Sequence, residues 1–146
     1  MGIAITKSEM FREVESTFGR VPEWMRDVPE SAAGFWILFR DFYLAETKIP
    51  NKYKELIGLG VSGATRCKYC ALFHTEAARL HGTTDEEIAE ASMMAGVTMC
   101  ASTFLNAQQT DYEKFSEETR DIVAFVKKQA SQPSKKSPQP QQHARS

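Results

Sequence analysis

The sequence has almost no excess of positive or negative charge, and it lacks a long uninterrupted apolar run. Its 146 residues include 18 Lys or Arg and 19 Asp or Glu, which gives a formal net charge of −1. Such a chain has no general attraction for nucleic acid or for an anionic membrane surface, so we expect neither as a partner. No apolar run approaches the ~20 residues of a membrane span. Residues 1–10 have no apolar stretch behind a basic start, as a secretory signal would. We therefore expect a cytoplasmic protein.

Cysteine is also scarce, with three residues in the chain. The disulfide frameworks of secreted proteins normally use an even number of cysteines. In a reducing compartment, two cysteines close in sequence are more often catalytic or metal-binding than structural. This makes Cys67 and Cys70 candidates for chemistry. Cys100 lies in a stretch rich in Ala and Met, and we expect it to be a buried small apolar residue.

Signals for β-strands are absent as well. No segment alternates for long with the strand period, and there is no Asn-Gly or Asp-Gly hairpin dipeptide. Apolar residues recur at helical spacing instead, which predicts one all-α domain of about six to eight helices over residues 1–130. The expected helices are one capped by Ser8 and stopped by Gly19, a short turn at Pro22, and longer helices over 30–46, 51–62, 67–81 and 84–109, with a last one capped by Ser116.

Two further segments have a distinctive composition. The predicted helix 30–46 has a very broad apolar face rich in aromatic residues, among them Tyr43, and we interpret these residues as core packing. Residues 131–146 are rich in Ser, Gln, Pro and Lys, and they carry no large apolar side chain. Such a segment cannot bury enough surface to offset the entropy of ordering, so we expect a disordered tail.

Chemistry is concentrated in the stretch from Cys67 to His74. Offsets of three, four and seven residues fall on one face of a helix, so Cys67, Cys70 and His74 are expected to line up. Cys67 lies near a helix N-terminus, where unpaired amides and the helix dipole favour a thiolate. Cys70, one turn further, is expected to be the more buried thiol, and His74 can accept its proton. A carboxylate normally orients such a base, and Glu55 on the preceding helix is the candidate.

Two other interpretations of this cluster stay open from the residues alone. Two cysteines and a histidine also suit a structural zinc site, with His81 or Cys100 as the spare soft ligand. The thiols could also form an inert structural pair. We adopt the redox interpretation because Cys67 is expected at a helix start, next to Arg66, where its thiolate is favoured.

The series Glu55, Cys67-x-x-Cys70 and His74 resembles the motif of the alkylhydroperoxidase D-like proteins, in the carboxymuconolactone decarboxylase superfamily. The resemblance covers about residues 50–108. It implies an all-α homo-oligomer, a trimer or hexamer, that reduces a small organic hydroperoxide or hydrogen peroxide. It also implies that no cofactor is needed besides a redox-active Cys67–Cys70 disulfide.

The same resemblance implies a role for each catalytic residue. Cys70 would be the peroxidatic thiol, activated by His74 and Glu55 and oxidised to a sulfenic acid. Cys67 would resolve the sulfenic acid to a disulfide and exchange with an external reductant. That reductant is expected to be a thiol or a lipoyl-type dithiol, and a peroxiredoxin is a further candidate partner.

Tyr69 departs from the family pattern. Well-studied members carry a second histidine between the two cysteines, whereas tyrosine is a poor base near neutral pH. We therefore expect a shorter proton relay or a phenol that only donates a hydrogen bond, and we treat Tyr69 as a secondary candidate. Two alternatives remain: a carboxymuconolactone decarboxylase-like lyase acting on a small lactone acid, whose chemistry would not use the dithiol, and a non-enzymatic, zinc-stabilised protein.

Overall fold

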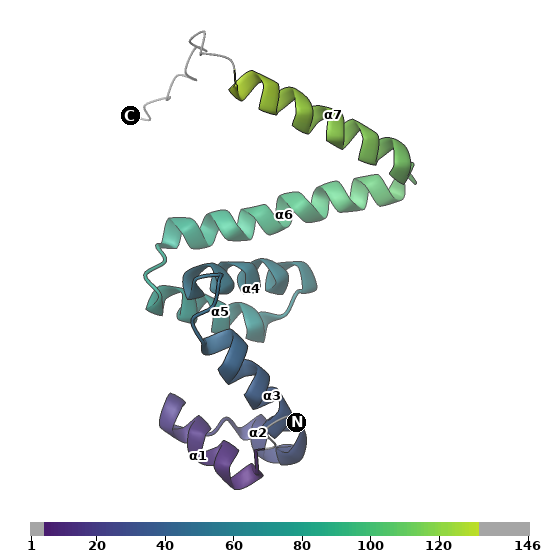
Figure 1. The fold of residues 1–146 in the computed structure, drawn as a ribbon. Helices are drawn as coiled ribbons and strands as arrows, with labels where there is room; N and C mark the ends of the chain where they lie inside the picture. The colour runs from purple at the N-terminus through teal and green to yellow at the C-terminus, as the bar shows by residue number, and fades with distance from the viewer. Residues whose placement is uncertain (1–4, 132–146) are drawn as a thin grey trace, which may run out of the picture. The chain divides into compact units, whose positions relative to one another are not determined.

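A computed structural model describes residues 5–131, and all regular secondary structure in this range is helical (Figure 1). The prediction of an all-α fold with six to eight helices is confirmed. The elements are α1 (Lys7–Phe18), α2 (Glu23–Asp27), α3 (Pro29–Leu38), the π-helix η1 (Phe39–Leu44), α4 (Asn51–Thr65), α5 (Lys68–Leu80), α6 (Asp85–Ala107) and α7 (Tyr112–Ala130). The chain divides into two units between Cys100 and Ala101, inside α6. The predicted tail, from residue 132 on, lies outside the described residues.

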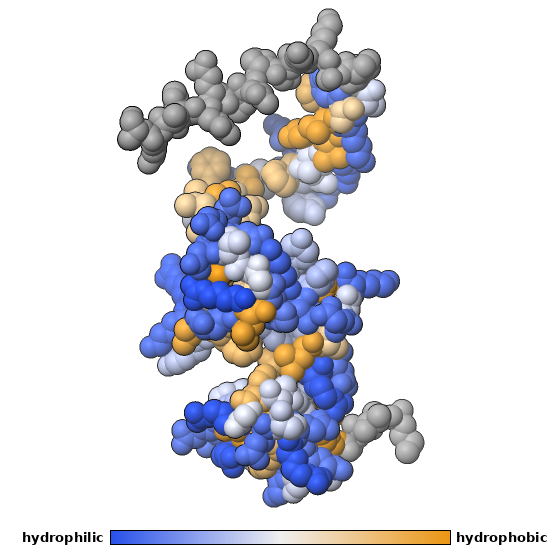
Figure 2. Space-filling model, turned by 90° about the vertical axis from the view of Figure 1, so that its left-hand side faces the viewer, coloured by the Kyte–Doolittle hydropathy of each residue, from blue (hydrophilic) through white to orange (hydrophobic). Residues whose placement is uncertain are grey.

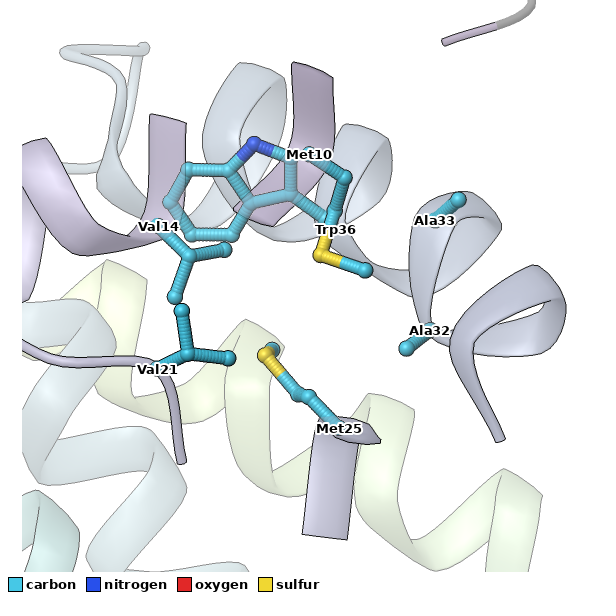
Figure 3. Packing of buried hydrophobic residues seen from close by; sticks show 7 residues of the cluster. All are labelled: Met10, Val14, Val21, Met25, Ala32, Ala33 and Trp36. Carbon is cyan, nitrogen blue, oxygen red and sulfur yellow. The ribbon is translucent and has the colours of Figure 1, made fainter. Parts of the chain in front are cut away.

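The apolar core of the first unit lies among its first three helices. Its members are Met10, Val14, Val21, Met25, Ala32, Ala33 and Trp36 (Figure 3). The predicted cap at Ser8 is wrong. Thr6 caps α1, because its hydroxyl accepts the Glu9 amide while the Glu9 carboxylate accepts the Thr6 amide. Gly19 ends the helix with a φ of 74°, as predicted.

The predicted helix 30–46 is not one continuous α-helix. It is regular through Leu38 and then continues as the π-helix η1. A π-turn inserts one extra residue into the helical repeat and so rotates the side chains that follow it. The expected core role of the aromatic residues holds for the buried Trp36, whereas Phe35 and Phe42 are exposed.

Helices α4 and α5 form the pair on which the site is built. They lie side by side (Figure 1), and only Arg66 and Cys67 connect them. So short a connection makes the two helices antiparallel neighbours. Arg66 adopts a φ of 58°, in the left-handed region, and turns the chain sharply between them. Helix α4 therefore ends three residues later than the predicted Ser62.

Helices α6 and α7 start at side-chain caps. A capping box starts α6, close to the start predicted at residue 84, since the Thr84 amide donates to Glu87 and the Glu87 amide donates to the Thr84 hydroxyl. Helix α7 begins earlier than the predicted Ser116, because the Asp111 carboxylate accepts the Lys114 amide at 2.7 Å. Neither helix has a buried residue. Cys100, expected to be buried, is therefore exposed in α6.

Among the described residues, α6 is the one helix long and apolar enough to cross a membrane. Its most apolar window has a mean hydropathy of 1.3, and none of that window is buried. A helix from the core of a soluble protein passes the same test of length and composition, and α6 begins with three acidic residues. This single match is weak support for a membrane span, and the absence of a membrane role stays a prediction.

Candidate active site

A buried carboxylate and an imidazole meet between α4 and α5. Glu55, on α4, is 2% exposed, and its Oε2 lies 2.8 Å from Nδ1 of His74 on α5. A carboxylate only accepts hydrogen bonds, so Nδ1 of His74 carries the donated hydrogen. This leaves Nε2 free to accept a proton. The fold thus brings together two predicted site residues that stand 19 positions apart.

Gly58 makes room for this imidazole. It lies three residues after Glu55, on the face of α4 that meets α5. A methyl group at Gly58 would stand 2.5 Å from both Nδ1 and Nε2 of His74, closer than a carbon atom can approach without displacing the ring. A glycine inside a helix costs about 1 kcal/mol relative to alanine. Here the absence of a side chain at Gly58 permits the close approach of His74 to Glu55.

Tyr43, on η1, is a functional candidate that the sequence interpretation missed. Its hydroxyl donates to the Glu55 carboxylate, 2.5 Å from Oε1 and also in contact with Oε2. The same hydroxyl lies 3.4 Å from Nδ1 of His74. Burial raises the pKa of Tyr43 above its usual value, and the adjacent Glu55 carboxylate raises it further. The phenol therefore stays protonated. The sequence signal that could have revealed Tyr43 was its hydroxyl group on a helix face otherwise rich in apolar residues such as Phe and Trp.

The start of α4 holds the end of η1 in place. Lys54 is 8% exposed, and its ammonium group donates to three backbone carbonyls, of Phe42 at 2.9 Å, Tyr43 at 3.3 Å and Ala45 at 2.6 Å. Asn51 donates to the carbonyl of Leu44 at 3.1 Å. These carbonyls stand at the end of a helix, where intrahelical partners are missing. Lys54 and Asn51 thereby fix the backbone that carries Tyr43.

The two thiols form a second group, at the start of α5. Cys67 is the N-cap, and its sulfur accepts the Cys70 amide at 3.3 Å. The pKa of Cys67 is lowered, most strongly by a hydrogen bond from the Cys70 thiol and less strongly by the backbone amides of Cys70 and Tyr69. The interaction with Cys67 raises the pKa of Cys70. Both cysteines are free thiols. The predicted thiolate-favouring position of Cys67 agrees with this direction.

The predicted burial of Cys70 is wrong: Cys70 is exposed and Cys67 is half-buried. Cys67 lies at the junction with α4, and His74 packs against Glu55 and Gly58 of α4, but the Cys70 side chain between them stays exposed. Cys70 and His74 are one helical turn apart, but within residues 5–131 no hydrogen bond joins them. The site therefore consists of two hydrogen-bonded groups that both include residues of α5: Tyr43–Glu55–His74, which joins η1, α4 and α5, and Cys67–Cys70 at the start of α5.

The secondary candidate, Tyr69, lies outside both groups. Its side chain is 76% exposed, and the Lys68 ammonium group lies 5.1 Å from the centre of its ring. In the described part of the chain, its hydroxyl makes no hydrogen bond.

No group of three or more His, Cys, Asp or Glu side chains in residues 5–131 could hold a metal ion. His81 and Cys100 thus do not complete the zinc site considered above in this part of the chain.

The sequence pattern of one known family matches this chain. The pattern of the carboxymuconolactone decarboxylase family matches residues 29–109, more than half of the chain, and this range contains every residue of the site. The chain is also 29% identical, over 65 residues, to "Uncharacterized protein 4 in cox locus" of Paracoccus denitrificans. That match covers 44% of this chain and 59% of the curated relative's length, so the chain spans about three fifths of that protein.

Two solved structures have a similar fold. The alkylhydroperoxidase AhpD core from Rhodospirillum rubrum is 27% identical, with a TM-score of 0.66 over 75% of this chain and 85% of that one. A protein from Methanobacterium thermoautotrophicum is 32% identical, with a TM-score of 0.54 over 60% of this chain and 97% of the other. The resemblance inferred from the motif is therefore confirmed, and the chain belongs to the carboxymuconolactone decarboxylase family, among its alkylhydroperoxidase D-like relatives.

Proposed function

We propose that the protein is a thiol-dependent hydroperoxide reductase that cycles between a Cys67–Cys70 dithiol and disulfide. The observation that carries this proposal is the hydrogen bond between the buried Glu55 carboxylate on α4 and His74, which stands on the helix that bears the dithiol. A buried carboxylate that orients an imidazole is the usual arrangement for activating a nearby nucleophile. The structural similarity to an alkylhydroperoxidase core supports the same chemistry.

The proposed cycle has two chemical steps on the protein. His74, through Nε2, takes the thiol proton of Cys70, and the thiolate attacks the terminal peroxide oxygen. The O–O bond breaks, Cys70 becomes a sulfenic acid, and the alkoxide leaves as an alcohol after taking a proton from the His74 imidazolium. The Cys67 thiolate then attacks the sulfenic sulfur of Cys70. A disulfide forms, and the hydroxide leaves as water after protonation.

The cycle closes with an external dithiol as reductant. A lipoyl-type dithiol, or another thiol, would attack the disulfide and carry away its two electrons as its own disulfide. The lowered pKa of Cys67 supports its role in the exchange, because thiolates are the reactive species and acidic thiols are good leaving groups. A peroxiredoxin is a further candidate partner. The cycle requires no cofactor beyond the two cysteines.

A hydroperoxide consumption assay tests the proposal. Purified protein supplied with a dithiol should consume an alkyl hydroperoxide, and Cys70→Ser should abolish turnover. Cys100→Ser is the matched control, because Cys100 is exposed on α6 and belongs to neither hydrogen-bonded group. Undiminished turnover in Cys70→Ser would rule out the proposed cycle. Stoichiometric hydroperoxide should also remove two free thiols and two hydrogens of intact mass as Cys67 and Cys70 join.

The family description keeps one alternative in view, a carboxymuconolactone decarboxylase-like lyase acting on a small lactone acid. Such a reaction makes no use of a thiol redox cycle. Alkylation of both Cys67 and Cys70 separates the two functions. It should eliminate hydroperoxide consumption, whereas turnover of a lactone acid by the alkylated protein would favour the lyase.

A further inference from the structure

The Glu55 carboxylate is enclosed by protein, and each of its oxygens has a known donor. Oε2 accepts from Nδ1 of His74 and from the Tyr43 hydroxyl. Oε1 accepts from Tyr43, its one hydrogen-bond donor among residues 5–131. A buried carboxylate oxygen without a donor is costly, so Tyr43 does more than fill space. It completes the solvation of the charge that orients the imidazole.

The backbone holds the phenol in this position from several sides. Tyr43 lies in the π-helix η1, whose last carbonyls are bound by Lys54. Its ring stacks on Phe39 with ring centres 4.4 Å apart, and the Phe73 ring lies 6.0 Å away. π-turns are rare and are frequently found at functional sites, and the residue that they insert changes the direction of the side chains that follow. Here the redirected side chain is the one that contacts Glu55.

We propose that Tyr43 is a positioning residue of this site: its hydroxyl holds the Glu55 carboxylate and moderates the pull of that carboxylate on the His74 imidazole. The part of this inference that concerns turnover rests on the proposed function. Its physical basis is that two donors, Tyr43 and His74, share one carboxylate. Each hydrogen bond to a carboxylate withdraws negative charge from it, so the phenol weakens the interaction available to an imidazolium.

The direction of the effect follows from this sharing. Without the phenol, the carboxylate stabilises the imidazolium of His74 more strongly, and the pKa of His74 rises. Nε2 then becomes a free base at a higher pH, and the acidic limb of the pH–rate profile moves upward. We expect an upward shift of less than about one pH unit, because the phenol acts on the imidazole only through the shared carboxylate.

Other charged and titratable groups near His74 do not take over this task. Lys54 points its ammonium group to backbone carbonyls, and several other charged groups on η1, α4 and α5 are paired with one another. They are Arg40 with Glu13 and Asp41 beside the site on η1, Arg79 with Glu76 and Asp85 on α5, Lys52 with Glu87 at the start of α6, and the Cys67–Cys70 pair. In the described part of the chain, none of these groups bonds to Glu55, whose carboxylate accepts hydrogen bonds from Tyr43 and His74.

Tyr43→Phe is the direct test, with Tyr112→Phe as the matched control. Both variants lose one phenol hydroxyl, but Tyr112 is 76% exposed on α7. NMR titration of the His74 ring, assigned with His74→Asn, should show a higher pKa in Tyr43→Phe and no change in Tyr112→Phe. The acidic limb of hydroperoxide-driven thiol loss should shift by the same amount. An unchanged His74 titration in folded Tyr43→Phe would overturn the inference.

A second measurement keeps the inference testable if Tyr43→Phe does not fold. Replacement of all tyrosines by 3-fluorotyrosine makes each phenol a stronger donor with little change in size. The pKa of His74 should then fall, opposite to the effect of Tyr43→Phe, and an unchanged or raised value would contradict the inference. These titrations do not require turnover. A protein that shows the His74 shifts but consumes no hydroperoxide would refute the proposed function and leave the positioning role intact.

Discussion

Cys67 and Cys70 show how two identical side chains acquire different acidities within one helical turn. Cys67 accepts hydrogen bonds from the Cys70 thiol and from backbone amides at the start of α5, and these stabilise its thiolate. Cys70 donates to Cys67 and is disfavoured as a second anion beside it. In the reduced protein without hydroperoxide, Cys67 is therefore expected to be the thiol that a simple alkylating reagent modifies first, whereas the proposed attack of Cys70 on a hydroperoxide depends on His74 taking its proton.

Iodoacetamide alkylation across a pH series measures this difference. The rate at Cys67 should reach its half-maximum at a lower pH than the rate at Cys70, because only the thiolate reacts. Cys70→Ala should raise the pKa of Cys67 toward its ordinary value, since its largest stabilising hydrogen bond is lost while the backbone amides remain. Peptide mapping after each pulse assigns the modified cysteine. Equal pH profiles for the two thiols would contradict the asymmetry.

Gly58 offers a second test at the scale of a single residue. In Gly58→Ala, the added methyl group meets the His74 ring and must displace it from Glu55. We expect destabilisation of about 2 kcal/mol from overpacking, together with a loss of hydroperoxide turnover. Gly34→Ala in α3 is the matched control, because a methyl group there has nothing within 4 Å. The control should gain about 1 kcal/mol from helix propensity and keep its activity. Urea unfolding measures both changes.

Among the elements, η1 depends on Lys54 for its C-terminal end. Lys54→Met keeps most of the side-chain length but removes the charge that three carbonyls share. Charge-assisted hydrogen bonds of this kind contribute about 2 kcal/mol, so the urea midpoint should fall clearly. Lys52→Met, two residues earlier, removes a more exposed ion pair with Glu87 and should cost less than about 1 kcal/mol. Equal losses in the two variants would exclude a special role for Lys54.

The helices themselves were largely predictable, because their signals are local. Gly19 adopts the left-handed conformation that ends a helix, and α6 starts at the Thr84–Glu87 capping box, at the start of the predicted helix 84–109. The spacing of Cys67, Cys70 and His74 was readable for the same reason. Even the wrong caps at Ser8 and Ser116 are errors of a few residues, where Thr6 and Asp111 supply better acceptors.

The π-helix and the contacts of Tyr43 were not predictable in this way. The aromatic residues of 30–46 give a broad apolar face that fits an α-helix as well as a π-turn, so periodicity cannot locate the extra residue. The hydrogen bond between Tyr43 and Glu55 joins side chains 12 positions apart, on two elements that Lys54 also links through the Tyr43 carbonyl. The exposure of Cys70 depends on what covers α5, which a pattern within one helix does not encode.

At the scale of the whole molecule, apolar surface remains uncovered on the described chain. Apolar side chains lie open on the surface between hydrophilic ones (Figure 2). In the first unit, an open groove of about 610 Å³ lies between α4 and α6, with Tyr53, Ile57, Val61, Met94 and Met99 in its lining. A contiguous apolar surface of this kind usually marks an interface. It supports the homo-oligomer, a trimer or hexamer, implied by the family motif, and we propose that a second copy covers this groove.

Substitution within the groove tests this assembly. Met94 lines the groove and is 62% exposed, whereas the adjacent Met93 is 68% exposed and lies outside the lining. Met94→Glu would bury a charge in the interface and should shift the protein toward monomer, because a buried unpaired carboxylate is strongly unfavourable. Met93→Glu adds the same charge outside the groove and should leave the molar mass unchanged. Light scattering coupled to size-exclusion chromatography at micromolar concentration measures both. A wild-type protein that is a uniform monomer would contradict the assembly, and equal behaviour of the two variants would place the interface elsewhere.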